Sequence, residues 1–314
     1  YYYGESQFNQ KHYKNLVYRV NPISPSFYEH VYDFGWLQSS EKLYINRMIE
    51  VGLKDSIFSN TPKVHKAEFT KLILVAHKVL RDLSNDPKSA ASLRDVKRTV
   101  SLFNWFYNGV GQHLLELIDS KSKELDAMTL SIFVCYCCRL KESGRKKFWS
   151  EIFAKINANS TALKIKSERY FQKLVKKVRM KFVKFLVIDG TEFQHIAMNK
   201  ALSENLFVGF VAIANKIPLF IIGKPGTSKS LSISILMQNL SNNSNSPLHK
   251  WGAPKIQHFF YQCSPESTEQ AVKTVFDSAR KFNKNIMPVV VLDEVGLAPI
   301  LKILHEELEF IDQL

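Results

Sequence analysis

The chain has 314 residues, of which 45% are hydrophobic and 23% charged. This composition excludes wholesale disorder and leaves room for two ordinary domains with a sizeable core. No apolar run reaches the roughly 20 residues of a membrane-spanning helix, and no secretory signal pattern opens the chain. The formal net charge of +14 raises the hypothesis of an anionic partner such as a nucleic acid.

Apolar periodicity predicts a mostly helical first part of the chain. The expected helices cover residues 27–32, 40–51, 61–83, 92–103 and 129–140, with further helices to residue 187, and only residues 16–20 read as a strand. The turn at Asp189 and Gly190 is the best candidate boundary. The sequence therefore predicts a helical part at 1–190 and a second domain at 191–314.

Three of the four cysteines are clustered, at Cys135, Cys137 and Cys138. Nothing near them completes a zinc-binding spacing, so we expect buried thiols rather than a redox pair or an acylation site. Free thiols are typical of a reducing, cytoplasmic compartment.

The densest basic stretch lies at residues 164–184. Within it Phe171, Val175, Val178 and Phe182 recur at steps of four and three, which is the spacing of a helix packed on a core. The interpretation favoured is a solvated basic face, and the alternative is a nucleic-acid-binding patch. No nucleic-acid-binding motif supports the patch.

The second part alternates strands and helices. A helix is expected at residues 197–215, a strand at 217–222, a helix at 231–237, a strand at 255–263, a helix at 264–282 capped by Ser264 or Ser267, and a strand at 288–294. This β–α–β–α–β order predicts a parallel sheet covered by helices.

Residues 223–230, Gly-Lys-Pro-Gly-Thr-Ser-Lys-Ser, lie between an apolar strand pattern and a helix pattern. Small residues there let backbone N–H groups approach phosphate oxygens, and the helix N-terminus adds further donors. Lys229 would reach the terminal phosphates and Ser230 would ligate magnesium. Ser228 stands where Gly is usual and would be strained at positive φ. The alternative is an ordinary Gly/Pro turn.

The strand at residues 288–294 ends in two carboxylates, Asp293 and Glu294. Asp293 would hold magnesium directly or through water, and Glu294 would polarise an attacking water. The cofactors that this pattern predicts are ATP and Mg²⁺. Catalysis is assigned to Lys229 and Glu294, the metal to Ser230 and Asp293, and nucleotide binding to Gly223, Lys224, Pro225, Gly226, Thr227, Ser228, Lys229, Ser230 and Leu231.

Residues 217–231 (IPLFIIGKPGTSKSL), 262–268 (QCSPEST) and 289–298 (VVVLDEVGLA) resemble an AAA+ module of the mysterin family, giant ring-finger ubiquitin ligases. Residues 18–20, 33–35, 41–45 and 196–205 are also similar to that family, so the resemblance covers most of the chain. The family also carries Ser at the position of Ser228.

The resemblance implies a P-loop NTPase of the AAA+ type at 191–314, truncated after the Asp293–Glu294 strand and preceded by the helical lid and connector of another AAA+ module at 1–190. Arg94 resembles a lid-helix arginine that contacts the nucleotide of that preceding module. The sheet strand between the loop strand and the acidic strand, the sensor on it, an arginine finger and the ring finger are expected outside this chain. Its partners would be neighbouring AAA+ modules of the same polypeptide and, through the absent parts, the ubiquitin machinery.

The leading hypothesis is an ATP-binding and ATP-hydrolysing module of a mysterin-like ubiquitin ligase. A second is a nucleotide-binding structural switch with little turnover. A third, less favoured, is a nucleic-acid motor, which the charge and the phosphate loop suggest.

Overall fold

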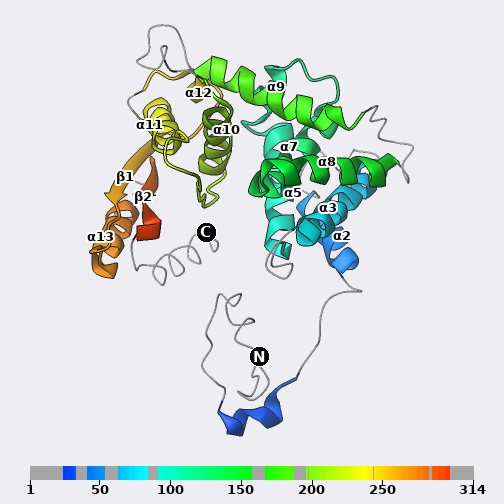
Figure 1. Cartoon of the computed structure of the whole chain (residues 1–314), viewed down its shortest axis with the longest axis horizontal. Coiled ribbons are helices and arrows are strands. Elements are labelled where there is room, and N and C mark those ends of the chain that lie inside the picture. Colours follow the sequence, from blue (N-terminus) through cyan, green and yellow to red (C-terminus); the bar gives the residue numbers. More distant parts are fainter. Residues whose placement is uncertain are drawn as a thin grey trace.

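The computed structural model describes residues 24–32, 41–53, 63–83, 91–157, 167–186, 196, 198–242, 244–282 and 285–297. Within these ranges the chain is mostly helical and carries one sheet of two parallel strands. Figure 1 shows helices α2 to α8 gathered in one group and α10 to α13 with both strands in another, with α9 lying across the two. The expected strand at 16–20 lies outside the described residues.

The first group confirms a helical first half. Its elements are a 3₁₀ helix (Pro25–His30), α2 (Glu41–Gly52), α3 (Lys63–Leu83), α5 (Leu93–Asn108), α6 (Gln112–Glu116), α7 (Lys123–Cys135), a 3₁₀ turn (Cys137–Arg139) and α8 (Glu142–Asn157). Helix α7 begins six residues before its predicted start at 129. Glu124 and Asp126 lie in its first turn, where the helix dipole favours acidic side chains, and apolar periodicity does not register them.

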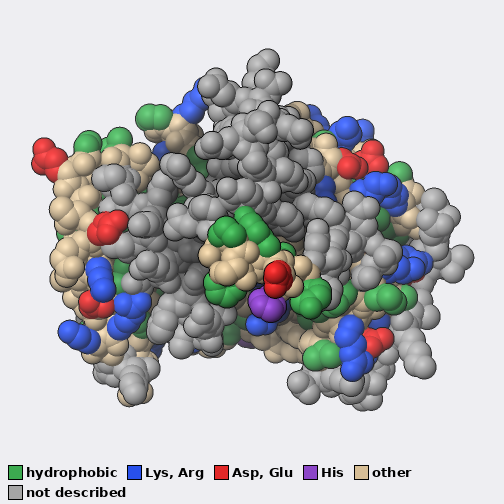
Figure 2. All heavy atoms as spheres, turned by 90° about the horizontal axis from the view of Figure 1, so that it is seen from below, with side chains coloured by type: hydrophobic (Ala, Val, Ile, Leu, Met, Phe, Trp, Pro, Cys, Tyr) green, Lys and Arg blue, Asp and Glu red, His purple; other side chains and the backbone are tan. Residues whose placement is uncertain are grey.

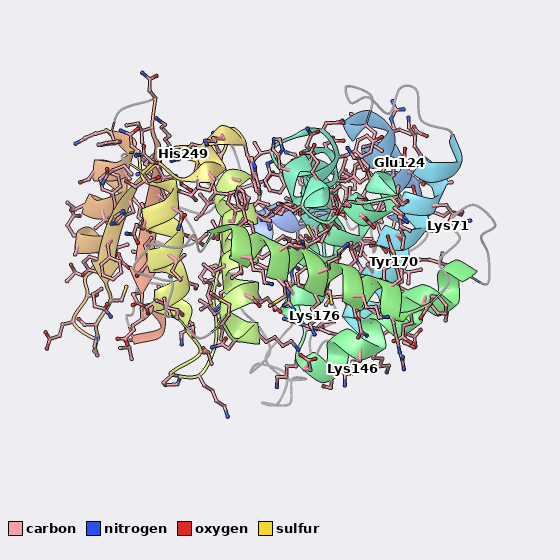
Figure 3. The ribbon with its side chains drawn as sticks, turned by 90° about the horizontal axis from the view of Figure 1, so that it is seen from above. Lys71, Glu124, Lys146, Tyr170, Lys176 and His249 are labelled. Carbon is pink, nitrogen blue, oxygen red and sulfur yellow. The ribbon has the colours of Figure 1, made fainter. Side chains whose placement is uncertain are left out.

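Helix α9 (Arg169–Leu186) has the predicted apolar stripe, with Phe171, Val175, Val178 and Phe182 all buried. Lys173, Lys176, Lys181 and Lys184 of this helix are exposed, and Lys176 is labelled in Figure 3. Lys177 instead donates to Ile118 O at 2.6 Å. The buried stripe and the exposed lysines match a helix packed on a core with a solvated basic face. Figure 2 views the molecule from the side opposite α9, and on that face the coloured Lys and Arg side chains lie among acidic ones along both flanks.

The three clustered cysteines, Cys135, Cys137 and Cys138, are buried or half-buried free thiols, as expected. Burial raises the pKa of the Cys135 thiol to about 12 and that of the Cys138 thiol to about 11. Because the reactive species is the thiolate, these side chains act as small apolar groups at neutral pH.

A single apolar core extends from the helical group into the second one. Phe207 of α10 (Lys200–Ala214) lies at its centre, with ring centroids 6.4 Å from Phe106 of α5, 6.4 Å from Phe133 of α7 and 6.2 Å from Phe182 of α9. Helix α10 therefore packs against helices outside its own group as well as against α11 (Lys229–Leu240).

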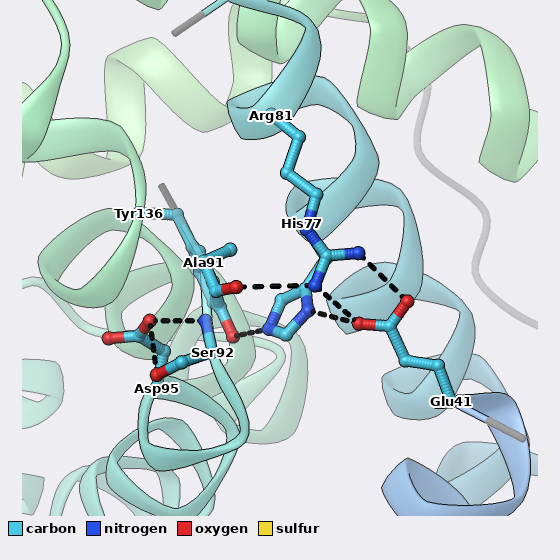
Figure 4. A network of polar contacts seen from close by, with 7 residues as sticks. All are labelled: Glu41, His77, Arg81, Ala91, Ser92, Asp95 and Tyr136. Atoms are coloured by element: carbon cyan, nitrogen blue, oxygen red, sulfur yellow. Dashed lines mark hydrogen bonds and ion pairs between the residues drawn. The ribbon is translucent and has the colours of Figure 1, made fainter. Parts of the chain in front are cut away.

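A buried polar network ties α2 to α3 and α7 (Figure 4). His77, 1% exposed, lies with Nδ1 3.1 Å from Glu41 Oε1 and Nε2 2.9 Å from the Tyr136 hydroxyl. A carboxylate only accepts, so Nδ1–H donates to Glu41 and Nε2 accepts from Tyr136. Arg81 donates to both carboxylate oxygens of Glu41, at 2.9 and 2.7 Å. Both ring nitrogens of the buried, neutral His77 side chain therefore have hydrogen-bond partners.

This network makes stability depend on pH. Burial lowers the pKa of His77 below its ordinary value of 6.5, so protonation favours the unfolded chain. Stability is present above pH 6.5 and is lost as the pH falls towards the folded-state pKa, by at most about 1.4 kcal/mol per pH unit for one proton. Urea unfolding between pH 7.5 and 5.5 should show this loss. The bond to Arg81 lowers the pKa of Glu41 below 4.5, so Glu41 adds its own loss only at lower pH.

The variant His77→Gln should flatten that pH slope, whatever its effect on absolute stability. His258→Gln is the matched control, because His258 is exposed on β1 and solvent surrounds it in both states. Equal slopes for the wild type and His77→Gln would show that His77 is not the group that titrates.

The second group comprises α10, α11 (Lys229–Leu240), α12 (Pro247–Lys250), β1 (Ile256–Gln262), α13 (Glu269–Arg280), β2 (Met287–Asp293) and a 3₁₀ turn (Val295–Leu297). The two strands confirm the predictions at 255–263 and 288–294. They run parallel in a register that pairs Gln262 with Asp293. The cap of α13 is Thr268, whose side chain accepts from Ala271 N, so the predicted caps Ser264 and Ser267 were wrong by four positions and one position.

The predicted strand at residues 217–222 is wrong. The segment has no strand assignment, and Phe220 and Ile222 are 59% and 93% exposed. Among the described residues no strand lies beside it, and the ladder joins β1 to β2 alone. A strand needs a neighbour to take its N–H and C=O groups, so an apolar pattern without a partner stays unpaired. The predicted α/β class is confirmed only in part: the described chain is mostly helix with a small parallel sheet.

Candidate functional site

Residues 223–230, the segment predicted to bind phosphates and called the phosphate loop below, connect the unpaired segment 217–222 to α11. Gly226 has φ +78° and Ser228 has φ +58°. Left-handed backbone costs a residue with a side chain about 1 kcal/mol. The backbone strain predicted for Ser228 is therefore present. At Gly223 an added Cβ would lie 2.7 Å from Thr227 Oγ1, which leaves room only for glycine.

The side chain of Lys229 curls back over the loop. Its Nζ donates to the carbonyl oxygens of Gly223, at 2.9 Å, and Lys224, at 3.1 Å. Thr227 Oγ1 closes the same turn by donating to Lys224 O at 2.8 Å. The ammonium group therefore lies within the loop, at the N-terminus of α11, where positive charge and backbone donors together suit an anion.

The loop meets the end of the acidic strand. Ser230 Oγ lies 3.4 Å from Asp293 Oδ2, although 63 positions separate the two residues. This contact brings the two residues proposed to hold magnesium to the same point. Of the other nominated residues, Lys224 and Pro225 are exposed in the loop and Leu231 is half-buried in α11 against the core.

Glu294 follows Asp293 in the left-handed region, with φ +52°. Its N–H donates to Asp293 Oδ1 at 3.0 Å, and its Oε2 accepts from Gln262 Nε2 at 3.1 Å. A strained, exposed carboxylate held by a neighbouring side chain is a common feature of functional sites. Both nominated carboxylates thus lie at the carboxyl end of β2.

Sequence reasoning did not nominate Gln262 as a site residue. The signal was present, because Gln262 ends β1 and parallel strands direct their carboxyl ends to one edge. Its register opposite Asp293 places it beside Glu294, and the register is a property of the paired sheet.

Two asparagines of the α10 region were also missed. Asn199 Nδ2 donates to Ser228 Oγ at 3.3 Å, and Asn205 Nδ2 donates to Thr227 O at 3.4 Å. Neither belongs to a phosphate-binding motif. No sequence spacing links them to the loop, because the contact depends on how α10 packs against α11.

The donor set at Ser230 and Asp293 fits Mg²⁺, which prefers oxygen ligands and is commonly held by one or two protein groups together with substrate phosphates and water. Over the residues that the structure describes, no group of three or more His, Cys, Asp or Glu side chains could hold a metal by itself. A metal held by Ser230 and Asp293 would take its other ligands from phosphate oxygens and water. Within the same part of the chain, no helix has the length and apolar character needed to cross a membrane.

Comparison with known proteins places these residues in a family. Residues 195–313 match the family described as the RNF213 AAA domain. The chain is 33% identical over 323 residues to the E3 ubiquitin-protein ligase RNF213 of Homo sapiens. It is 31% identical over 322 residues to RNF213 of Mus musculus and 30% identical over 312 residues to rnf213-beta of Danio rerio.

Each alignment covers 94% of this chain and 6% of the relative, so the chain spans a small part of the length of these proteins. The alignments extend beyond the matched domain into the helical group. The chain is thus homologous to the RNF213 (mysterin) ubiquitin ligases over nearly all of its length, and its residues 195–313 belong to the RNF213 AAA domain family.

Proposed function

We propose that residues 191–314 bind ATP with Mg²⁺ and, as part of a longer RNF213-like ubiquitin ligase, hydrolyse it. The observation that carries the proposal is the 3.4 Å contact between Ser230 Oγ and Asp293 Oδ2. It joins the phosphate loop to the acidic strand end, and an ordinary Gly/Pro turn would have no reason to meet that pair of carboxylates. Residues 1–190 would be the lid and connector of a preceding module.

Each nominated residue has a defined task in this proposal. The amides of the loop and the ammonium of Lys229 hold the phosphates, and Ser230 and Asp293 hold Mg²⁺, which neutralises phosphate charge when bound. Glu294 accepts a hydrogen bond from the attacking water and orients it. Gln262, by donating to Glu294, keeps that carboxylate at the edge of the sheet until the substrate is in place.

The first test is calorimetric titration of the chain with Mg²⁺·ATP. Saturable one-site binding that EDTA weakens is expected. The absence of heat at millimolar nucleotide, confirmed by an unchanged melting temperature, would rule out nucleotide binding by this chain.

The variant Glu294→Gln should separate binding from hydrolysis. In the longer protein that carries the remaining sheet, we expect Mg²⁺·ATP affinity within about twofold of the wild type and single-turnover phosphate release slowed by at least about 100-fold, because the amide cannot take up the proton of the attacking water. Normal phosphate release would exclude Glu294 from this role.

If the wild-type protein binds Mg²⁺·ATP but releases no phosphate, the alternative of a nucleotide-dependent structural switch is favoured. We do not propose the third hypothesis, a nucleic-acid motor, because no contact among the described residues favours it over the other two.

A further inference from the structure

Helix α10 packs on α11, and two residues of the α10 region contact the phosphate loop. Gly209 lies at the contact between the two helices. A Cβ at Gly209 would lie 2.6 Å from Leu236 Cδ1, so the absence of a side chain at Gly209 lets Leu236 of α11 pack directly on α10. Helix α11 begins at Lys229, at the end of the loop. The position of the loop therefore depends on α10 through packing as well as through hydrogen bonds.

The amide of Asn199 is oriented by its second role. Its Oδ1 accepts from Leu202 N at 2.8 Å and so caps α10. With the oxygen fixed on the helix, the Nδ2 group must face Ser228, and it donates to Ser228 Oγ at 3.3 Å. The cap therefore decides which amide atom of Asn199 is the oxygen and which is the nitrogen.

This hydrogen bond gives the hydroxyl of Ser228 a structural role. Glycine would adopt the left-handed conformation of residue 228 without strain, but it would offer no hydroxyl to Asn199. Serine is strained there, with φ +58°, and becomes dependent on the partner that holds its side chain. Asn205 adds a second tie, to the backbone oxygen of Thr227.

Another face of α10 is anchored against α8 and α9. Glu204 Oε1 accepts from Arg145 Nη1 of α8 at 2.6 Å, and its Oε2 accepts from Arg179 of α9. Arg145 also donates to Leu140 O and Cys138 O, each at 2.7 Å. Because these groups are largely buried, α10 cannot shift without breaking the ion cluster.

We propose that Asn199 and Asn205 are positioning residues of the phosphate loop, carried by a helix that Glu204 anchors, and that Ser228 is the residue through which Asn199 acts. The inference rests on the proposed function, since it concerns affinity for the phosphates of ATP. It predicts that removing the Asn199 amide weakens nucleotide binding although Asn199 lies outside the phosphate-binding motif.

Asn199→Ser is the variant to test, because serine caps a helix as well as asparagine does but is too short to reach Ser228. Calorimetry of the full chain should show Mg²⁺·ATP affinity weakened about fivefold, the effect of one hydrogen bond, with the melting temperature unchanged. Asn215→Ser, at the other end of the same helix, should leave the affinity as in the wild type.

A double-mutant cycle with Ser228→Gly tests whether Asn199 acts through Ser228. In the Ser228→Gly background the hydroxyl is gone, so Asn199→Ser should have no further effect on affinity, whereas Asn205→Ala, which breaks a bond to the backbone, should still weaken binding. An unchanged affinity for Asn199→Ser, or the same loss in both backgrounds, would overturn the proposal.

Hydrogen exchange of the nucleotide-free chain separates this proposal from the proposed function. Amides of residues 224–230 should exchange faster in Asn199→Ser than in the wild type or in Asn215→Ser. If the wild type binds no nucleotide, the proposed function fails, while faster exchange still supports the positioning role and unchanged exchange overturns it.

Discussion

Replacing Lys229 by alanine is expected to weaken Mg²⁺·ATP binding by about 10- to 150-fold. The Lys229 Nζ lies within hydrogen-bonding distance of two loop carbonyls, at 2.9 and 3.1 Å, so its charge is already located where phosphates would bind. A charge-assisted hydrogen bond contributes about 1.5–3 kcal/mol, and each 1.4 kcal/mol is a factor of ten in affinity. The measurement is calorimetric titration of both chains.

The matched control for Lys229 is Lys273→Ala. Lys273 is exposed on α13, which packs on the sheet away from the loop, so the substitution removes the same charge without touching the site. The control should bind as the wild type does. Wild-type affinity in Lys229→Ala would mean that the ammonium is not a phosphate ligand, and the assignment of the loop would have to be abandoned.

Replacing Glu204 by glutamine should produce the largest loss of stability among single substitutions in this ion cluster. The side chains of Arg179 and Arg145 are 9% and 20% exposed and share this one carboxylate. Arg179 Nε is buried without a hydrogen-bond partner in the described part of the chain. Without Glu204, two buried guanidinium groups would face each other, which costs about 3–5 kcal/mol.

That loss corresponds to a melting temperature lowered by roughly 6–12 °C. Glu142→Gln is the control, because Glu142 also pairs with a cation, Lys200, but its side chain is 60% exposed. An exposed pair contributes at most about 1 kcal/mol, so the control should melt close to the wild type. Similar melting temperatures for the two variants would show that the cluster of Glu204 does not anchor α10.

Local chemistry made much of the candidate site predictable. A run of small residues before Lys229 and a β-branched strand ending in Asp293 are patterns that depend on neighbours in sequence. The same holds for the apolar stripe of α9, whose spacing follows from the helical period. Predictions of this kind survived because the forces that produce them act over a few residues.

The prediction for residues 217–222 depended on more than its own sequence. An apolar, β-branched segment is competent to form a strand, but its backbone groups need a partner, and the described residues offer none. The exposed Ile222 is the consequence. The cap of α13 failed for a smaller reason, since several hydroxyls precede that helix and packing selected Thr268.

By itself, then, the sequence determined where the loop pattern at 223–230, the acidic pair at the end of β2 and most of the helices lie, because each is encoded by short-range spacing. Only the tertiary structure decided that Ser230 meets Asp293, that Gln262 holds Glu294 and that Asn199 supports Ser228. These contacts join residues 29 to 63 positions apart. Their geometry is set by the register of two strands and the packing of α10 on α11, which no local pattern specifies.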